Sequence, residues 1–275
     1  MPELPEVETI VQSLRPHILG REISGITVLL PKIIHAACGA PDYLIGRTVT
    51  DIFRQGKTII IDLSDGWHLR IHLKMTGQLL INLPGDPFLK HTHVVMSLDG
   101  NELELRYRDI RQFGFLQILT PEEWGDWLGR NPTGPDPLEI SLASFSSRLG
   151  RKKGRIKSVL LDQTFLGGLG NIYIDEILHQ ARIHPETSPV ALSAEEIHFL
   201  YHRMQAILKA AIQKKGSSVR NYTEASGQRG QYQTLHQVYG RYALPCRHCG
   251  TLIAKTKVAG RGTCFCPQCQ KKPSG

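Results

Sequence analysis

The spacing of hydrophobic residues near the N-terminus predicts an amphipathic helix. Apolar side chains recur there at the i, i+3, i+4 intervals that place them on one helical face: Val7, Ile10, Val11, Leu14 and Ile18. Pro5 suits the first turn of a helix, where its missing N–H removes no hydrogen bond. Glu6 and Glu8 suit the positive end of the helix dipole. We therefore expect a helix within residues 2–20.

A different pattern follows, in which short β-rich runs are separated by turn residues such as those at 64–66 and 99–101. The runs cover residues 23–30, 48–55, 57–63, 68–81, 92–98, 101–108 and 113–119. Six or seven strands of this kind predict a β-sandwich or barrel.

Beyond residue 128 the pattern becomes helical. Three prolines and two glycines within 129–139 indicate a linker. Helical periodicity then covers 141–149, 155–164, 171–182 and 193–215, and the glycine-rich stretch 166–171 separates two of these helices like a helix–turn–helix. A small module begins near Val238 and carries five of the six cysteines. The sequence thus predicts an α+β multidomain protein.

Composition restricts the class of protein. The chain has 275 residues, which is enough for two domains with separate cores. It has no run of about 18 apolar residues, so we expect no membrane span. The acidic start MPELPEVE is unlike a secretory signal. These features predict a cytosolic protein, in which cysteines are metal ligands or free thiols more often than disulfides.

The net charge of +8 is unevenly distributed. Residues 225–275 contain eight Lys/Arg and no Asp/Glu, whereas the preceding 224 residues hold 25 of each sign. A second acid-free cluster comprises Arg148, Arg151, Lys152, Lys153, Arg155 and Lys157. Localised positive charge is typical of proteins that bind polyanions, although a solvated basic face without a partner has the same composition.

Four of the cysteines have the spacing of a zinc site. Cys246-x2-Cys249 and Cys266-x2-Cys269 are separated by 16 residues, as in a four-cysteine zinc ribbon. Four thiolates close the coordination sphere, so we predict one structural zinc ion and no catalytic metal. Cys264 is the only competing ligand nearby. Cys38, far upstream, is predicted to be an ordinary packed or surface residue.

The segment between the two cysteine pairs, 251–263, alternates like a β-hairpin and carries Lys255, Lys257 and Arg261. A basic hairpin tip next to glycines can place a guanidinium in a groove or on a phosphate. The alternative is that Arg261 merely solubilises a small module.

The N-terminus offers a nucleophile. Removal of Met1 leaves the secondary amine of Pro2, and α-amino groups titrate near 7.7–8.0 against about 10.4 for lysine. Such amines form Schiff bases with carbonyl carbons, and in DNA that carbon is C1′ of a deoxyribose that has lost its base. Glu3 could transfer protons to or from the sugar. Alternatively, Glu3 and Glu6 are only favourable residues at the start of a helix.

Eight segments together carry a family resemblance: MPELPEVETI, QGKTIII, HLKMTG, KHTHV, RDIRQFGF, LDQTFLGGLGNIYIDEIL, VYGR and the cysteine ribbon. In their order and spacing, from Pro2 to about Gln270, the chain resembles bacterial formamidopyrimidine-DNA glycosylases. The resemblance implies base-excision repair of oxidised purines (8-oxoguanine and formamidopyrimidines opposite cytosine), with associated β,δ-elimination at abasic sites. It also implies a monomer that acts on double-stranded DNA without an organic cofactor.

The resemblance also implies roles for individual residues. Pro2 matches the Schiff-base nucleophile and Glu3 the catalytic acid. Lys57 matches the proton donor of β-elimination, and Arg261 matches an arginine linked to δ-elimination and phosphate contact. Residues matching DNA contacts are His91, Lys152 and Asn171, the last at the start of the second helix of a helix–two-turn–helix motif.

Met75, Arg111 and Phe113 match three side chains that fill the gap left by a nucleotide flipped out of the duplex. A flexible thioether, a planar guanidinium and an aromatic ring suit that task. Judged by burial statistics alone, Met75 and Phe113 would be expected in the core. The chain departs from the family at Gln112, where a second arginine is common.

The implied domains are a catalytic helix and β-sandwich (1–128), a linker (129–140), a helical DNA-binding domain with the lesion-recognition loop (141–237) and the zinc ribbon (238–275). The loop is assigned to 226–233, and its presence favours purine lesions. Two alternatives remain: an endonuclease VIII-like glycosylase for oxidised pyrimidines, and a DNA-binding relative without catalysis.

Overall fold

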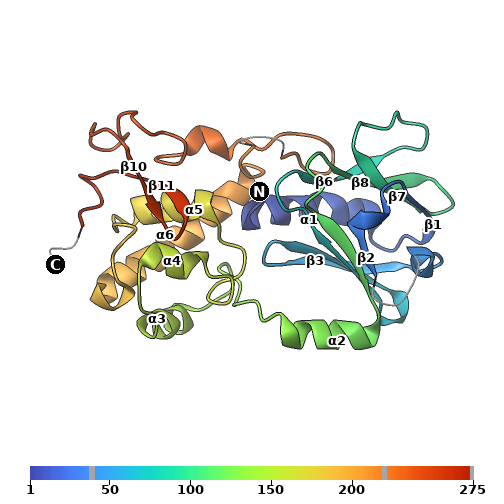
Figure 1. Ribbon diagram of the computed structural model, residues 1–275, viewed down its shortest axis with the longest axis horizontal. Helices are drawn as coiled ribbons and strands as arrows, with labels where there is room; N and C mark the ends of the chain where they lie inside the picture. The colour runs from blue at the N-terminus through green and yellow to red at the C-terminus, as the bar shows by residue number, and fades with distance from the viewer. Residues whose placement is uncertain (37–40, 219–221, 273–275) are drawn as a thin grey trace. The chain divides into compact units, whose positions relative to one another are not determined.

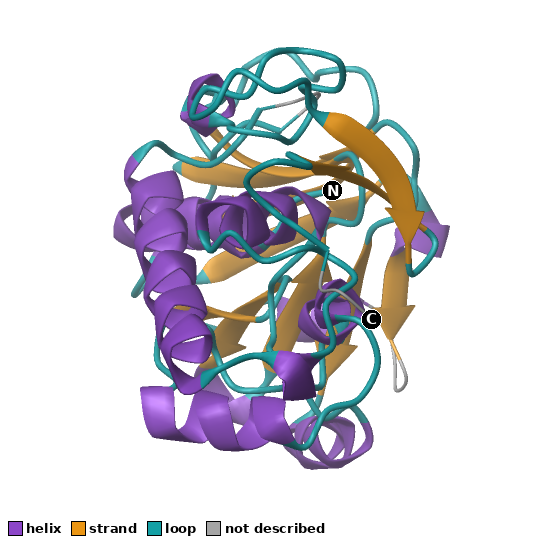
Figure 2. Ribbon diagram, turned by 90° about the vertical axis from the view of Figure 1, so that its left-hand side faces the viewer, coloured by secondary structure: helices purple, strands orange, loops and turns teal. Residues whose placement is uncertain are grey.

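The computed structural model describes residues 1–36, 41–218 and 222–272. The described chain forms two compact units, one containing Met1–Pro132 and Lys215–Gln231, the other Thr133–Lys214 and Tyr232–Gly275. Helices and strands both make up a large share of the chain (Figure 2), as expected of an α+β fold. None of the described helices is long and apolar enough to cross a membrane.

The first unit contains two β-sheets and the N-terminal helix α1 (Leu4–Ile18). One sheet has the order β1-β7-β8-β6, formed by Ile23–Val28, Thr92–Leu98, Leu103–Asp109 and Gly77–Asn82. The other has the order β2-β9-β5-β4-β3, formed by Ile34–Ala36, Phe115–Leu119, His68–His72, Thr58–Leu63 and Val49–Gln55. β2 and β9 pair in parallel, and every other pair of neighbouring strands is antiparallel.

A single hydrophobic core joins both sheets to α1. It combines Val7 and Leu14 of the helix with Ile61 of the five-stranded sheet and Tyr107 of the four-stranded sheet. The helix packs against β3 and β4, and Figure 1 labels α1 and β3 in this unit. The predicted N-terminal helix and β-sandwich are therefore confirmed. Helix α2 (Pro121–Arg130) follows β9 and was not predicted.

The second unit is helical, with a β-hairpin at its C-terminal end. Its helices are α3 (Leu142–Gly150), α4 (Ile156–Leu161), α5 (Asn171–Gln180) and α6 (Ala194–Gln213), and the hairpin consists of β10 (Ala254–Val258) and β11 (Arg261–Phe265). Helix α5 contacts α4, α6 and β11. All four helices lie where hydrophobic periodicity predicted them.

Buried Glu176 of α5 attaches the cysteine module to the helices. Its carboxylate accepts hydrogen bonds from the backbone N–H groups of Gln237 (2.7 Å), Val238 (2.9 Å) and Tyr239 (2.8 Å). These three donors offset part of the cost of burying the carboxylate, although burial still raises the pKa of Glu176. The start of the cysteine module is thereby fixed to α5.

One segment differs from the predicted domains. Residues 215–231, predicted to belong with the helices, form a compact unit with residues 1–132 instead. This grouping has a physical basis in hydrogen bonds to α1 and β6: Ile81 N–H donates to Ala225 O (3.0 Å), and Ala225 N–H donates to Ser13 Oγ (3.2 Å).

Candidate functional site

The N-terminal residues are fixed by the start of α1. Pro2 and Glu3 are buried, and Glu3 is the N-cap residue of the helix. The Glu6 carboxylate, only 1% exposed, accepts hydrogen bonds from the Glu3 N–H (2.8 Å) and the Ser217 N–H (2.7 Å). Glu6 thus ties the first residues of the chain to the segment 215–231.

Close packing at Gly216 explains part of that segment's sequence. The residue has a positive φ of 75°, and a Cβ added there would lie 2.8 Å from the Glu6 carboxylate. Only glycine can adopt this φ and leave room for the Glu6 carboxylate without strain. The same compact unit that contains Pro2 and Glu3 also contains residues 226–231 of the predicted lesion-recognition loop.

Lys57 lies in the two-residue turn between β3 and β4. Gln55 pairs with Thr58, and Gly56 supplies the positive φ (60°) that a tight hairpin turn of this kind needs at its first central position. His72, at the end of β5, lies close enough to Lys57 for the charge of the lysine to affect the pKa of the histidine. Its burial, together with the positive charges of Lys74, Arg70 and Lys57, lowers the pKa of His72 to about 3.

A neutral His72 beside these cations was not predicted as a functional residue. The HLKMTG segment contains it, but its low pKa arises from burial and from neighbours that only folding brings together. The His72 Nδ1 atom accepts a hydrogen bond from the Lys74 N–H (3.1 Å), which directs the chain toward Met75.

Met75, Arg111 and Phe113 lie together at the surface of the first unit. The Arg111 guanidinium contacts the Met75 sulfur (2.9 Å) and lies over the Phe113 ring, 4.6 Å from its centroid. Met75 is 38% exposed and Phe113 is 54% exposed, so neither is the core residue that burial statistics favoured. The structure therefore brings the three predicted gap-filling side chains into one exposed group.

His91 lies in the turn before β7, with a positive φ of 71°. Its carbonyl accepts the Asp109 N–H (3.0 Å), and the preceding Lys90 carbonyl accepts a hydrogen bond from Arg108 Nε (2.8 Å). These bonds hold the turn against β8 and leave the His91 ring half-buried.

In the second unit, Asn171 and the hairpin tip are joined by a hydrogen bond. Asn171 is the first residue of α5, and its Nδ2 donates to the Gly262 carbonyl (2.9 Å). Arg261 precedes Gly262 and follows Ala259 and Gly260, whose positive φ values (49° and 73°) form a tight hairpin turn. Arg261 thus adjoins a residue that is hydrogen-bonded to the first residue of a ten-residue helix, and helix N-termini favour anions.

Lys152, the third predicted DNA contact of this unit, forms an ion pair. Its ammonium lies 3.2 Å from the Asp162 carboxylate, which also accepts hydrogen bonds from Thr164. Both charged side chains are more than a third exposed, so water screens the pair and a phosphate can compete for the lysine.

Cys246, Cys249, Cys266 and Cys269 converge, and their sulfur atoms lie within 4.8 Å of one another. Three of the S···S separations are 3.4, 3.5 and 3.9 Å. A tetrahedron with Zn–S bonds of about 2.3 Å requires separations of about 3.8 Å. The donor set fits one structural zinc ion. Cys264 is outside the group, and its N–H donates to Asp175 (3.0 Å).

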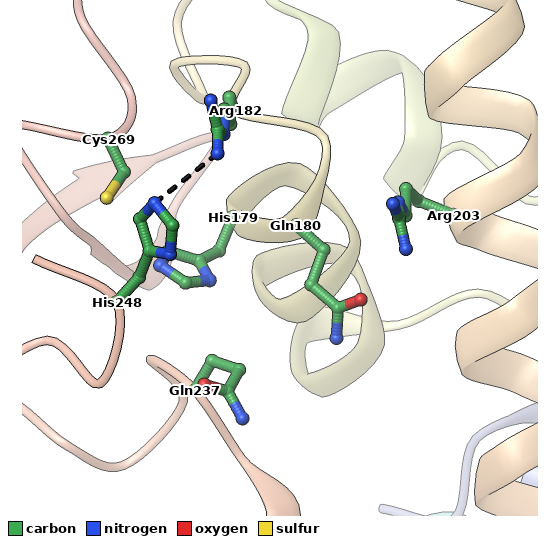
Figure 3. A pocket seen from close by; sticks show the side chains of 7 residues that line it. All are labelled: His179, Gln180, Arg182, Arg203, Gln237, His248 and Cys269. Atoms are coloured by element: carbon green, nitrogen blue, oxygen red, sulfur yellow. Dashed lines mark hydrogen bonds between the residues drawn. The ribbon is translucent and has the colours of Figure 1, made fainter.

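A pocket of about 240 Å³ is lined by Cys269 of the cysteine cluster together with polar side chains (Figure 3). Its polar lining includes Arg182, Arg203, His179 and His248, and Arg182 donates a hydrogen bond to His248 Nε2 (3.3 Å). None of the predicted catalytic residues lines this pocket. The pocket is therefore not a candidate for the predicted active site.

Comparison with known proteins decides the family. The family model for the formamidopyrimidine-DNA glycosylase N-terminal domain matches residues 1–116, the model for the H2TH domain of the same enzymes matches 132–223, and the zinc finger found in FPG and IleRS matches 243–272. The chain belongs to the formamidopyrimidine-DNA glycosylase family. It is therefore a DNA glycosylase of base-excision repair, and an associated lyase activity is typical of this family.

Individual relatives match over almost their whole length. Formamidopyrimidine-DNA glycosylases from Heliobacterium modesticaldum and Pelotomaculum thermopropionicum are 44% and 41% identical to the chain, with 98% of this chain and at least 99% of each relative covered. A variant of Lactococcus lactis FPG in complex with Fapy-dG-containing DNA has a TM-score of 0.89 at 37% identity, covering 98% of this chain and 100% of that one. The family's zinc finger coincides with the four-cysteine cluster, so the chain holds one structural zinc.

Proposed function

We propose that the chain excises oxidised purines from duplex DNA through a Schiff base at Pro2 and then cleaves the strand by elimination. The observation that carries this proposal is the position of Pro2 and Glu3 at a rigid helix start. There the Glu3 backbone is fixed by Glu6, which also holds the segment 215–231. The solved L. lactis FPG complexes contain Fapy-dG or an abasic site, which supports these substrates.

In the first step, the Pro2 nitrogen attacks C1′ of the damaged nucleotide and the N-glycosidic bond breaks. The base leaves with the bonding electron pair and takes up a proton, while the nitrogen loses its own. The sugar ring then opens to give an iminium ion. Glu3, whose carboxyl group lies nearest to Pro2 in sequence, is the proposed proton carrier for the sugar.

The iminium acidifies the hydrogen on C2′, because the electrons of the C–H bond can enter the C=N system. Its removal expels the 3′-phosphate in β-elimination, and a second elimination expels the 5′-phosphate. Lys57 is the proposed proton donor of the β step. The low pKa of His72 keeps its imidazole neutral at pH 7, so His72 adds no charge beside Lys57.

Met75, Arg111 and Phe113 are proposed to fill the duplex after the damaged nucleotide is extruded, which costs a few kcal/mol of lost stacking and pairing. Their exposure and mutual contact support this role, because a thioether, a guanidinium and a ring already form one protruding group. We refer to these three side chains as the wedge.

Phosphate binding is assigned to His91 in the first unit and to Lys152, Asn171 and Arg261 in the second. The bond between Asn171 and the Gly262 carbonyl supports joint action of α5 and the hairpin on one phosphate. The basic C-terminal fifth of the chain adds a sequence-independent attraction to DNA. We further propose that the enzyme acts as a monomer in the cytosol.

The substrate assignment is tested by borohydride trapping on duplexes with 8-oxoguanine opposite cytosine, with thymine glycol and with no lesion. We expect a covalent adduct on the first duplex and little on the other two. A Pro2→Gly variant, which replaces the secondary amine, is the matched control. Trapping on thymine glycol alone would instead favour an endonuclease VIII-like activity.

A further inference from the structure

The wedge is attached to the fold through one buried carboxylate. Asp109, the last residue of β8, is 0% exposed and accepts four hydrogen bonds. Its Oδ1 accepts from the Thr76 hydroxyl and from the Arg111 N–H (3.1 Å). Its Oδ2 accepts from the Gly114 N–H (2.8 Å) and from the Tyr107 hydroxyl (3.4 Å). Four donors offset the cost of burying this group.

Three of these four donors belong to the two loops that carry the wedge. Thr76 directly follows Met75 in the loop between β5 and β6, and its hydroxyl oxygen also accepts the Arg111 N–H (3.0 Å). Gly114 directly follows Phe113 in the loop between β8 and β9. Arg111 therefore bonds to Asp109 through its own backbone N–H, whereas Met75 and Phe113 each adjoin a residue that bonds to Asp109.

Both loops have backbone conformations that need such support. Lys74 and Gln112 are not glycines, yet they have positive φ values of 48° and 56°. The left-handed conformation is unfavourable for a residue that carries a Cβ atom. At Gly114 a Cβ would lie 2.1 Å from the Tyr107 hydroxyl oxygen, 2.7 Å from the His72 carbonyl oxygen and 3.2 Å from Asp109 Oδ2, so the close approach of the loop to these groups requires glycine.

We infer that Asp109, together with Thr76, is the positioning unit of the wedge for the extrusion step of catalysis. This inference rests on the proposed role of Met75, Arg111 and Phe113. Exposed side chains have little packing to hold them. Without support from the loops they would lose conformational entropy when they insert into DNA, and this loss would slow insertion. The carboxylate orders both loops before DNA binds, without contacting the substrate.

Thr76→Val is the sharpest perturbation. It keeps the shape of the side chain and removes both the donor to Asp109 and an acceptor for the Arg111 N–H. Hydrogen bonds to charged groups contribute about 1.5–3 kcal/mol, which corresponds to a loss of roughly ten- to a hundredfold in a rate that depends on them. Thr76→Ser keeps the hydroxyl and should stay within about threefold of the parent chain, because only a methyl group is lost.

Two substrates distinguish a loss of wedge positioning from a general loss of enzyme activity. The first is a duplex with 8-oxoguanine opposite cytosine, followed by single-turnover excision and by 2-aminopurine fluorescence next to the lesion. The second is a single strand with a preformed abasic site, which needs Pro2 chemistry but no extrusion. We expect Thr76→Val and Asp109→Asn to slow excision and the fluorescence change on the duplex, and to trap normally on the single strand.

Ile23→Val, a core substitution in β1 away from both loops, controls for reduced stability. Phe113→Ala tests the wedge itself. If Phe113→Ala leaves duplex excision unchanged, the proposed wedge is wrong. If Phe113→Ala slows it while Thr76→Val and Asp109→Asn do not, the positioning role of Asp109 is wrong. Equal losses on both substrates, or failure of Thr76→Ser to restore the rate, would also overturn this inference.

Discussion

The buried ion pair between Lys157 and Asp175 allows a quantitative prediction for the second unit. The Lys157 Nζ atom lies 2.6 Å from Asp175 Oδ1 and 2.8 Å from the Thr263 hydroxyl, and the lysine side chain is completely buried. Asp175 Oδ2 accepts the Cys264 N–H (3.0 Å). One pair of charges therefore joins α4, α5 and the strand that begins with Arg261.

Asp175→Asn should destabilise this unit strongly, because it leaves a buried ammonium without a counter-charge. Burial raises the pKa of Asp175 to about 6, although the charge of Lys157 acts in the opposite direction. Burial of the charged carboxylate is therefore unfavourable even when it is paired with the lysine. Removing one partner of a buried pair typically costs about 3–5 kcal/mol. Replacing both partners by apolar residues, as in Lys157→Met with Asp175→Leu, is often close to neutral.

Urea unfolding of the zinc-loaded chain measures this difference. All three tryptophans (Trp67, Trp124 and Trp127) lie in the first unit, so fluorescence follows that unit, while far-UV circular dichroism also follows the helices of the second. We expect Asp175→Asn to lower the dichroism midpoint and to leave the fluorescence midpoint unchanged. A loss below about 1 kcal/mol, in the range of exposed pairs, would refute the reasoning.

Three further predictions concern protons, zinc and salt. The pKa of His72 is depressed to about 3, so an unfolded chain binds a proton there at a higher pH than the folded one. This contribution to stability is present above about pH 6.5 and is lost as the pH falls toward 3. The variant His72→Gln should therefore reduce the slope of the unfolding free energy against pH by the equivalent of up to about one proton. Urea unfolding titrations at several pH values across this range measure that slope. Zinc chelation should abolish DNA binding in a fluorescence-anisotropy titration without shifting the tryptophan unfolding midpoint, and unchanged affinity would contradict the proposed role of the hairpin. Arg261→Ala should reduce the slope of log affinity against log salt by about one, whereas an equal slope would mean that Arg261 contacts no phosphate.

Local patterns in the sequence predicted most helices and strands correctly. The segment 193–215 has helical periodicity and forms α6 (Ala194–Gln213), whose N-cap Ser193 forms a capping box with Glu196. Helix α2 was missed although Thr120, Pro121 and Glu123 provide the same signal. The parallel pairing of β2 with β9 has no local signal, since it joins segments about 80 residues apart.

The residues proposed to carry the chemistry are marked by the family resemblance, whereas the residues that hold them in place could not be predicted from the sequence. Glu6 was interpreted only as a favourable residue near a helix start, yet its carboxylate binds a backbone N–H more than 200 residues away. Asp109 and His72 lie inside quoted motifs without any assigned role. Their importance depends on burial and on distant donors, which neither periodicity nor spacing encodes.

The central claim is that the amine of Pro2 forms the covalent bond to DNA. The most direct measurement is mass spectrometry of the borohydride-trapped adduct after proteolysis, made with chains that have lost Met1 and with a variant extended at the N-terminus. We predict that the DNA remnant lies on the peptide beginning with Pro2 and that the extended variant yields no adduct. A remnant on the peptide containing Lys57, or trapping by the extended variant, would contradict the account.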